Sequence, residues 1–201
     1  MRPDRRSGAA TGAAKADLRR SLVRARARRA PTRDIADAAR TDALLAWLAG
    51  LNVSTVAAYE SWPSEPGTAA LIAALEHRGV RVLVPRLVRD ASGGWLPDWT
   101  PAGESVSLGA AALAQADAVL VPGLAGTLDG DRLGRGGGWY DRALVHARGP
   151  VCLLLDEDEV LLRVPVEPHD RRVDAIATPS GVRACQGRSR GTDYTFQVAD
   201  R

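Results

Sequence analysis

The segment from Arg132 to Asp141 contains residue types that could close around a phosphate group. Four glycines occupy five consecutive positions in it, namely Gly134, Gly136, Gly137 and Gly138. Because glycine leaves a turn without side chains, backbone N–H groups can surround phosphate oxygens there. A helix expected to begin near Tyr140 would direct its positive end at the same anion, and Arg132 and Arg135 could add charge-assisted hydrogen bonds. The segment matches neither the G-x-x-x-x-G-K-[ST] nor the G-x-G-x-x-G pattern, and a flexible surface turn is the alternative interpretation.

A second group of basic residues lies near the N-terminus. Lys15 is the only lysine of the chain, and Arg19 follows it four residues later, so both lie on one face of a helix. A lysine ammonium is a compact point charge that arginine replaces poorly at a crowded phosphate. The surrounding run 19–29 is rich in arginine, which fits nucleic acid, a polyanionic small molecule or a solvated helix face. An aromatic content of only 4 % argues against binding of single-stranded nucleic acid.

Composition limits the class of protein. The 201 residues, 45 % of them hydrophobic, fit one globular domain with a net charge of +3. No apolar run approaches the roughly 20 residues that a membrane-spanning helix needs. The basic start of the chain has no apolar segment typical of a secretion signal. Cys152 lies in an apolar run and reads as a core thiol. We therefore expect a cytoplasmic protein that binds no membrane.

Hydrophobic periodicity gives the order of the elements. We expect disorder over 1–13, followed by helices over 14–30 and 32–49. Short apolar runs then alternate with helical segments. Strands are expected at 55–59, 80–84, 118–121, 151–155 and 175–178, and helices at 68–78, 110–115 and 140–147. Pro85 is expected to end the second strand. Residues 90–109 are expected to be rich in loops, with Gly93-Gly94 suggesting a turn in a hairpin, and 183–201 to form a tail with one candidate strand at 194–198.

This alternation predicts an α/β fold of three layers, in which a mostly parallel sheet carries helices on both faces. The prediction places one domain over residues 14–182. Ligands of such folds bind outside the carboxyl ends of the strands. The glycine-rich segment follows the strand expected at 118–121, as that rule requires.

The glycine-rich segment Arg-Leu-Gly-Arg-Gly-Gly-Gly-Trp-Tyr-Asp, 132–141, resembles the signature of the 5-formyltetrahydrofolate cyclo-ligase family, also called methenyltetrahydrofolate synthetases. Segments 15–19, 59–65, 84–85, 121–125 and 165–174 resemble other family segments in the same order, so the resemblance spans about 14–182. The chain departs from the family at four places. Trp139 replaces a frequent tyrosine, Gly126-Thr127 replaces Phe-Asp, 155–159 lacks a common glutamine-containing pattern, and the chain after Val182 is unmatched.

The resemblance implies an enzyme that uses ATP and Mg²⁺ to cyclise 5-formyltetrahydrofolate to 5,10-methenyltetrahydrofolate, through phosphorylation of the formyl oxygen. Its implied catalytic residues are Lys15 and Arg135. Its implied ATP-binding residues are Lys15, Arg19, Arg132, Leu133, Gly134, Arg135, Gly136, Gly137, Gly138, Trp139 and Tyr140. Its implied folate-binding residues are Glu60, Glu65, Arg135 and Trp139, and its implied Mg²⁺ ligands are Asp141 and Asp170.

The sequence also allows three other functions. A related protein could keep the ATP loop and act on another small molecule, as the changes at Gly126-Thr127 and Trp139 would allow. A nucleotide sensor would bind ATP without turnover. A nucleic-acid-binding module would use the arginine-rich helix and show steeply salt-dependent binding. We expect a monomer that binds a small-molecule folate substrate and has no nucleic-acid partner.

Overall fold

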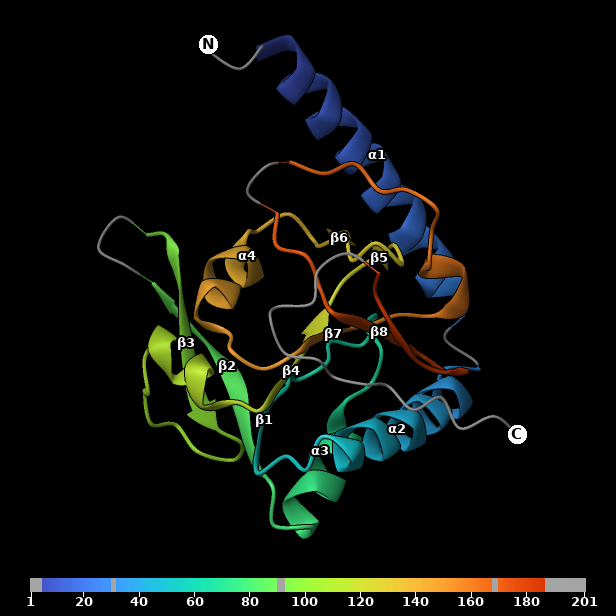
Figure 1. Ribbon diagram of the computed structural model, residues 1–201. Coiled ribbons are helices and arrows are strands. Elements are labelled where there is room, and N and C mark those ends of the chain that lie inside the picture. The colour runs from blue at the N-terminus through green and yellow to red at the C-terminus, as the bar shows by residue number, and fades with distance from the viewer. Residues whose placement is uncertain (1–4, 30–31, 90–92, 168–169, 187–201) are drawn as a thin grey trace.

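The computed structural model describes residues 5–29, 32–89, 93–167 and 170–186, with side chains described from Thr11 onward. The described strands form a seven-stranded sheet of order β3-β2-β1-β4-β7-β8-β9 (Figure 1). These strands are β1 (Thr55–Ala57), β2 (Arg81–Arg89), β3 (Trp95–Pro101), β4 (Ala118–Pro122), β7 (Val151–Leu154), β8 (Ala175–Thr178) and β9 (Gly181–Ala184). The five inner strands run parallel to one another, whereas β3 and β9 are antiparallel edge strands.

Helical segments cover both faces of this sheet. One face carries α2 (Arg33–Gly50) and α3 (Ala69–His77), and the other carries η2 (Ala110–Gln115), α4 (Trp139–Ala143) and η3 (Leu144–His146). Side chains alternate along β4, so that Leu120 packs with the α2 and α3 leucines while Val119 packs with Leu113 and Leu144. The predicted three-layer α/β fold with a mostly parallel sheet is confirmed.

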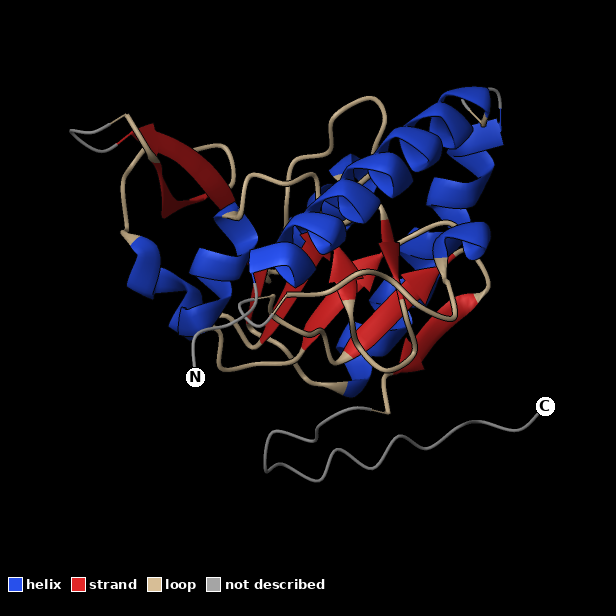
Figure 2. Cartoon of the chain, turned by 90° about the horizontal axis from the view of Figure 1, so that it is seen from above, coloured by secondary structure: helices blue, strands red, loops and turns tan. Residues whose placement is uncertain are grey.

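A long first helix extends beyond the three layers. Helix α1 (Arg5–Arg28) lies beside the segment that follows β7, in which Glu157–Glu159 form the short helix η4 (Figures 1 and 2). Its Leu22 packs in a small separate cluster with Leu124, Leu133 and Val164. Leu133 belongs to a two-stranded ribbon of β5 (Ala125–Gly126) and β6 (Arg132–Leu133). This cluster fixes α1 over the ribbon that leads into the glycine-rich segment.

Pro85 does not end the second strand, contrary to our expectation. Strand β2 continues through Pro85 to Arg89 and pairs with β3, which lies in the segment that we expected to be rich in loops. The two strands flank Gly93-Gly94, where a hairpin turn was expected. Strand β1 pairs with β2 only as far as Leu83, so the side of β2 that faced β1 becomes an edge beyond that point. A proline that lacks an N–H group is tolerated on such an edge.

Both ends of the described chain contain more regular structure than we expected. Helix α1 begins at Arg5, whereas we expected disorder before residue 14. Four alanines between residues 9 and 14 explain this, because alanine has the highest helix propensity. The candidate strand at 194–198 lies outside the described residues, but β9 starts the expected tail with a hairpin. None of the described helices combines the length and apolar character needed to cross a bilayer.

Candidate active site

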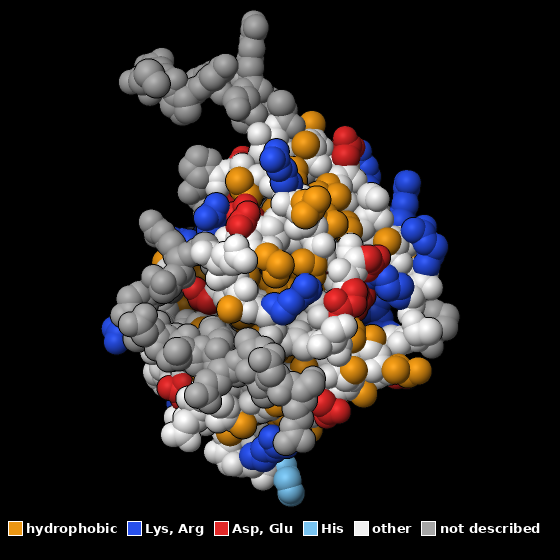
Figure 3. Space-filling model, turned by 45° about the vertical axis from the view of Figure 1, so that its right-hand side comes forward, with side chains coloured by type: hydrophobic (Ala, Val, Ile, Leu, Met, Phe, Trp, Pro, Cys, Tyr) orange, Lys and Arg blue, Asp and Glu red, His pale blue; other side chains and the backbone are white. Residues whose placement is uncertain are grey.

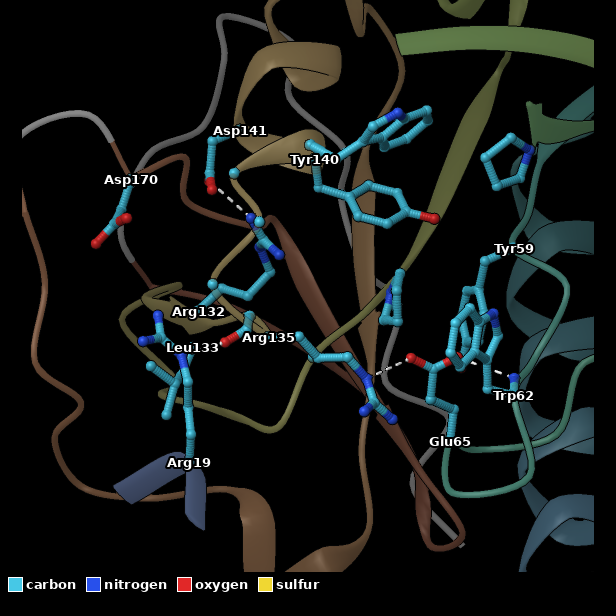
Figure 4. A pocket seen from close by; sticks show the side chains of 18 of the residues that line it. Arg19, Tyr59, Trp62, Glu65, Arg132, Leu133, Arg135, Tyr140, Asp141 and Asp170 are labelled. Carbon is cyan, nitrogen blue, oxygen red and sulfur yellow. Dashed lines mark hydrogen bonds and ion pairs between the residues drawn. The ribbon is translucent and has the colours of Figure 1, made fainter. Parts of the chain in front are cut away.

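A cavity of about 420 Å³ opens at the carboxyl ends of the central strands (Figure 4). Glu60 enters it just after β1, Leu87 from the far half of β2, and Gly123 just after β4. All residues that the sequence analysis assigned to a site line this one cavity: Lys15, Arg19, Glu60, Glu65, Arg132, Leu133, Gly134, Arg135, Gly136, Gly137, Gly138, Trp139, Tyr140, Asp141 and Asp170. The structure thus brings them together, while their individual roles stay predictions.

The glycine-rich loop connects β6 to α4 in a conformation that requires glycine. Gly136 and Gly138 have φ angles of +104° and +62°, in the region that side-chain-bearing residues rarely adopt. A Cβ atom on Gly136 would also lie 3.3 Å from Cζ of Arg19. Helix α4 that follows contains only five residues, because a 3₁₀ turn replaces the rest of the helix expected at 140–147. Aligned peptide dipoles are therefore fewer than we expected, so a smaller helix-dipole effect is available at this loop.

Helix α1 brings two cations to this loop. The Lys15 ammonium is buried and donates to Asp170 Oδ2 and Glu167 Oε2, at 2.6 Å each. Burial alone would lower the pKa of Lys15, but the hydrogen bonds and charges of Asp170 and Glu167 outweigh it and raise the pKa. One turn further along α1, Arg19 donates from Nε to the carbonyl oxygen of Gly134, at 2.8 Å. The raised pKa means that Lys15 carries its positive charge at neutral pH.

Asp141, in helix α4, and Asp170, in the segment after η4, both line the cavity. Their carboxylates are of the kind that binds Mg²⁺. Asp141 Oδ1 accepts from Arg132 at 2.7 Å and from the backbone N–H of Arg171 at 3.1 Å (Figure 4). Within the described part of the chain, no three acidic, histidine or cysteine side chains form a cluster that could hold a metal alone. Mg²⁺ is commonly held by one or two carboxylates together with phosphate oxygens and water. Two hard carboxylates beside the glycine-rich loop could contribute to such a set.

The wall opposite α1 is built by the loop after β1. Glu65 is buried and accepts from Arg135 Nε at 2.9 Å and from the backbone N–H of Trp62 at 3.0 Å (Figure 4). Arg135 also donates to Ser64 Oγ at 2.7 Å. The side chain of Arg135 thus joins the glycine-rich loop to the Glu65 wall. Glu60 lies exposed at the start of the same loop.

Two departures from the family pattern have different positions. Gly126-Thr127 does not line the cavity; Thr127 is buried in the turn of the β5–β6 ribbon, where its Oγ1 accepts from the Asp131 N–H at 3.2 Å. Trp139 does line it, but its indole packs edge-to-face on Trp99 and Tyr140, with ring centroids 5.4 and 4.8 Å apart. The first departure therefore has no direct effect on a ligand, and the second is anchored by core contacts.

Sequence reasoning missed several lining residues. Glu167 is one, although it lies only three residues before Asp170 in the matched C-terminal segment. Trp62 and Leu87 are exposed at the cavity and form an apolar part of its wall. The family-like segment 59–65 pointed at Trp62, but no sequence signal pointed at Leu87, because we expected the strand to end at Pro85.

The sheet is mostly parallel, and a glycine-rich loop, basic side chains and carboxylates meet at its carboxyl edge. This arrangement is typical of α/β enzymes that act on phosphorylated ligands. The sequence model of the 5-formyltetrahydrofolate cyclo-ligase family matches residues 11–179, and the chain belongs to this family. The predicted resemblance is confirmed.

Individual relatives agree with this membership. The chain is 38 % identical over 187 residues to the 5-formyltetrahydrofolate cyclo-ligase of Mycolicibacterium smegmatis, covering 82 % of this chain and 93 % of that protein. It is 31 % identical over 144 residues to the enzyme of the same name from Escherichia coli K12, covering 64 % and 79 %. The fold is shared with the 5,10-methenyltetrahydrofolate synthetases of Mycoplasma pneumoniae (TM-score 0.67, 21 % identity, 82 % and 98 % covered) and Aquifex aeolicus (0.67, 23 %, 90 % and 98 %).

Proposed function

We propose that this protein is a 5-formyltetrahydrofolate cyclo-ligase that converts its substrate and ATP into 5,10-methenyltetrahydrofolate, ADP and phosphate in the presence of Mg²⁺. The observation that carries the proposal is that a glycine-rich loop, four basic side chains and both candidate metal ligands meet in one cavity. Membership of the cyclo-ligase family supports the choice of folate as the second substrate.

The reaction has to make a leaving group from an amide oxygen. The N5-formyl carbon is a poor electrophile, and N10 cannot expel oxide from it. Transfer of the γ-phosphoryl group of ATP to the formyl oxygen forms a C–O–P linkage. N10 then attacks the carbon and loses its proton to the departing phosphate or to water, the C–O bond breaks, and phosphate departs with the electron pair of that bond. Phosphoryl transfer depends on positioning and charge stabilisation more than on covalent help from the protein.

Each part of the cavity has a place in that reaction. Lys15, Arg19 and Arg132, with the glycine-rich loop, bind the phosphates by charge-assisted hydrogen bonds. Arg135 lies between the loop and the Glu65 wall, so it can stabilise charge on the group in transfer. Asp141 and Asp170 would hold Mg²⁺, which supplies positive charge next to the phosphates.

The Glu65 wall is the proposed folate side of the cavity. Glu65 would accept from N–H groups of the pterin ring, and its ion pair with Arg135 at 2.9 Å holds the carboxylate at the cavity wall. Glu60 adds a second carboxylate, and the Trp139 ring offers an apolar surface next to the loop.

We also infer a monomeric, cytoplasmic enzyme with small-molecule substrates and no nucleic-acid partner. Part of the arginine-rich run of α1 is taken up by ion pairs within the protein. Arg26 is buried against Glu159, and Arg29 pairs with Asp156 and Asp158 at 2.7 and 2.6 Å. On the face that Figure 3 shows, basic and acidic side chains are interspersed.

Light scattering should give the monomer mass, and a gel-shift assay with duplex DNA or RNA at low salt should show no complex.

The proposed activity is tested by the near-ultraviolet absorbance of the methenyl product. Purified protein with 5-formyltetrahydrofolate, ATP and Mg²⁺ should raise this absorbance, and omission of either ATP or Mg²⁺ should abolish the rise. Asp141→Asn should slow it by about a hundredfold or more, as loss of a charge-stabilising group does. No rise, with ATP still bound in calorimetry, would point to a different small-molecule substrate or to a nucleotide sensor.

Two neighbouring glycines offer a matched test of the loop. Gly136→Ala should weaken ATP binding by about tenfold, because its φ of +104° and the nearby Arg19 both oppose a Cβ atom. Gly137→Ala places a Cβ with no heavy atom within 4 Å and should change the dissociation constant by less than about twofold. Calorimetric titration of both variants measures the difference. Equal effects would mean that the observed loop conformation is not the one that binds ATP.

A further inference from the structure

Glu167 has no role in the reaction described above, yet it is held at its centre. Its Oε2 lies 2.6 Å from the Lys15 ammonium, the same distance as Asp170 Oδ2. The backbone N–H of Glu167 also donates to Asp170 Oδ2 at 2.7 Å, and the Asp170 N–H donates to the Glu167 carbonyl oxygen at 3.0 Å. This turn presents both carboxylates to one buried ammonium.

The ion pairs of Lys15 with Glu167 and Asp170 compete with its proposed role in phosphate binding. An ammonium that binds two carboxylates is less available to a phosphate, because both anions compete for the same three N–H donors. Asp170 can be drawn away by Mg²⁺, for which it is a proposed ligand. Glu167 is not a proposed ligand of the metal, and its contact with Lys15 is a hydrogen-bonded ion pair of 2.6 Å.

The charge of the cavity adds to this competition. Among the described lining residues, four are basic and five are acidic, so the cavity lining carries a net charge of −1. ATP without a metal carries about four negative charges at neutral pH and enters against this balance. One divalent cation changes the balance of the cavity from −1 to +1. Glu167 is one of the two carboxylates that touch Lys15, and unlike Asp170 it is not a proposed Mg²⁺ ligand.

We propose that Glu167 makes nucleotide binding depend on the divalent cation, by holding Lys15 and by keeping the empty cavity anionic toward metal-free ATP. This inference rests on the proposed ATP and Mg²⁺ dependence and adds a specificity-determining residue to it. Glu167 acts through Lys15, so it is a positioning residue for that lysine. In its presence, metal-free ATP meets both a paired lysine and a repulsive cavity.

The test is ATP affinity measured by calorimetry with EDTA and with Mg²⁺, which needs no turnover. Glu167→Gln should tighten ATP binding in EDTA by about five- to tenfold, because it removes one partly buried charge from the competition. With Mg²⁺ its dissociation constant should stay within about twofold of the wild-type value. Glu167→Asp keeps the charge and should behave as the wild type does.

Glu60→Gln is the matched control. Glu60 lines the same cavity and carries the same charge, but it is not one of the two carboxylates that hold Lys15. We expect it to tighten metal-free ATP binding by less than about twofold, because its charge is exposed and screened. An equal effect of both variants would overturn the role of the Lys15 contact.

The remaining outcomes separate this inference from the proposed function. If wild-type protein binds ATP with Mg²⁺ but Glu167→Gln leaves the affinity in EDTA unchanged or weaker, the inference fails and the enzyme assignment stands. If wild-type protein binds no ATP in either condition, the proposed function fails as well. Tighter binding is also a result that simple structural damage does not produce.

Discussion

Lys15→Ala should lower kcat/KM for the cyclisation by about 10²- to 10⁴-fold, the range typical of losing one charge-stabilising group in a water-poor site. The ammonium is buried and lies beside both a candidate metal ligand and the glycine-rich loop. The fold should survive, since Leu22 and Arg26 still anchor α1 further along. The rate of methenyl formation measures the loss, and a circular dichroism melt shows whether the fold is intact.

Two further variants define what Lys15 contributes. Lys15→Arg keeps the charge, but a planar guanidinium is larger and cannot occupy the same point between Asp170 and Glu167, so we expect recovery of less than about a tenth of the wild-type rate. Arg24→Ala changes an exposed arginine of the same helix and should leave the rate within about twofold. A nearly normal rate for Lys15→Ala would exclude Lys15 from the reaction.

The parts of the fold that could be predicted from sequence are those with local signals. The buried strands β4, β7 and β8 are short apolar runs, and each lies within a residue or so of its expected place. The hairpin turn at Gly93-Gly94 could be predicted from its glycines, but strand β3 after it could not be identified this way. It contains Pro97 and Pro101 and is defined by pairing with β2, a contact that depends on the path of the chain between them.

The candidate site shows the same division. The glycines and Lys15 with Arg19 could be identified because their spacing is local and their chemistry is specific. Their pairings could not, because Lys15 meets Glu167 across 152 positions of sequence. Glu167 therefore looked like one more charged residue of a loop. Only the fold shows that it shares an ammonium with Asp170.

The arginine-rich run gives the clearest case of a structural role hidden in composition. Arg26 looks like its neighbours in the sequence, and a solvated helix face was one interpretation. In the fold its side chain is 1 % exposed and pairs with Glu159, which is fully buried. Two parallel hydrogen bonds join them, from Nε to Oε1 at 2.7 Å and from Nη2 to Oε2 at 2.6 Å. Arg29 adds a third contact to Glu159 at 2.9 Å.

Glu159→Ala should therefore lower the free energy of unfolding by about 3–5 kcal/mol, because it leaves the Arg26 charge buried without its partner. Urea denaturation followed by tryptophan fluorescence measures this as a shift of the midpoint at constant slope. The control is Asp17→Ala, which breaks the exposed ion pair with Arg20 on the same helix. That change should alter the free energy of unfolding by less than about 1 kcal/mol.

Replacing both partners separates the interaction from the burial of an unpaired charge. The double variant Arg26→Met with Glu159→Leu removes both charges at similar volume, and such replacements are often neutral or stabilising. Here we expect it to recover most but not all of the loss, because Arg26 Nη2 also donates to the Gly123 carbonyl oxygen at 2.5 Å. Gly123 lines the cavity, so the double variant should also bind ATP more weakly even where its stability returns. If the double variant is as unstable as Glu159→Ala, the loss comes from the packing of α1 and not from an unpaired buried charge.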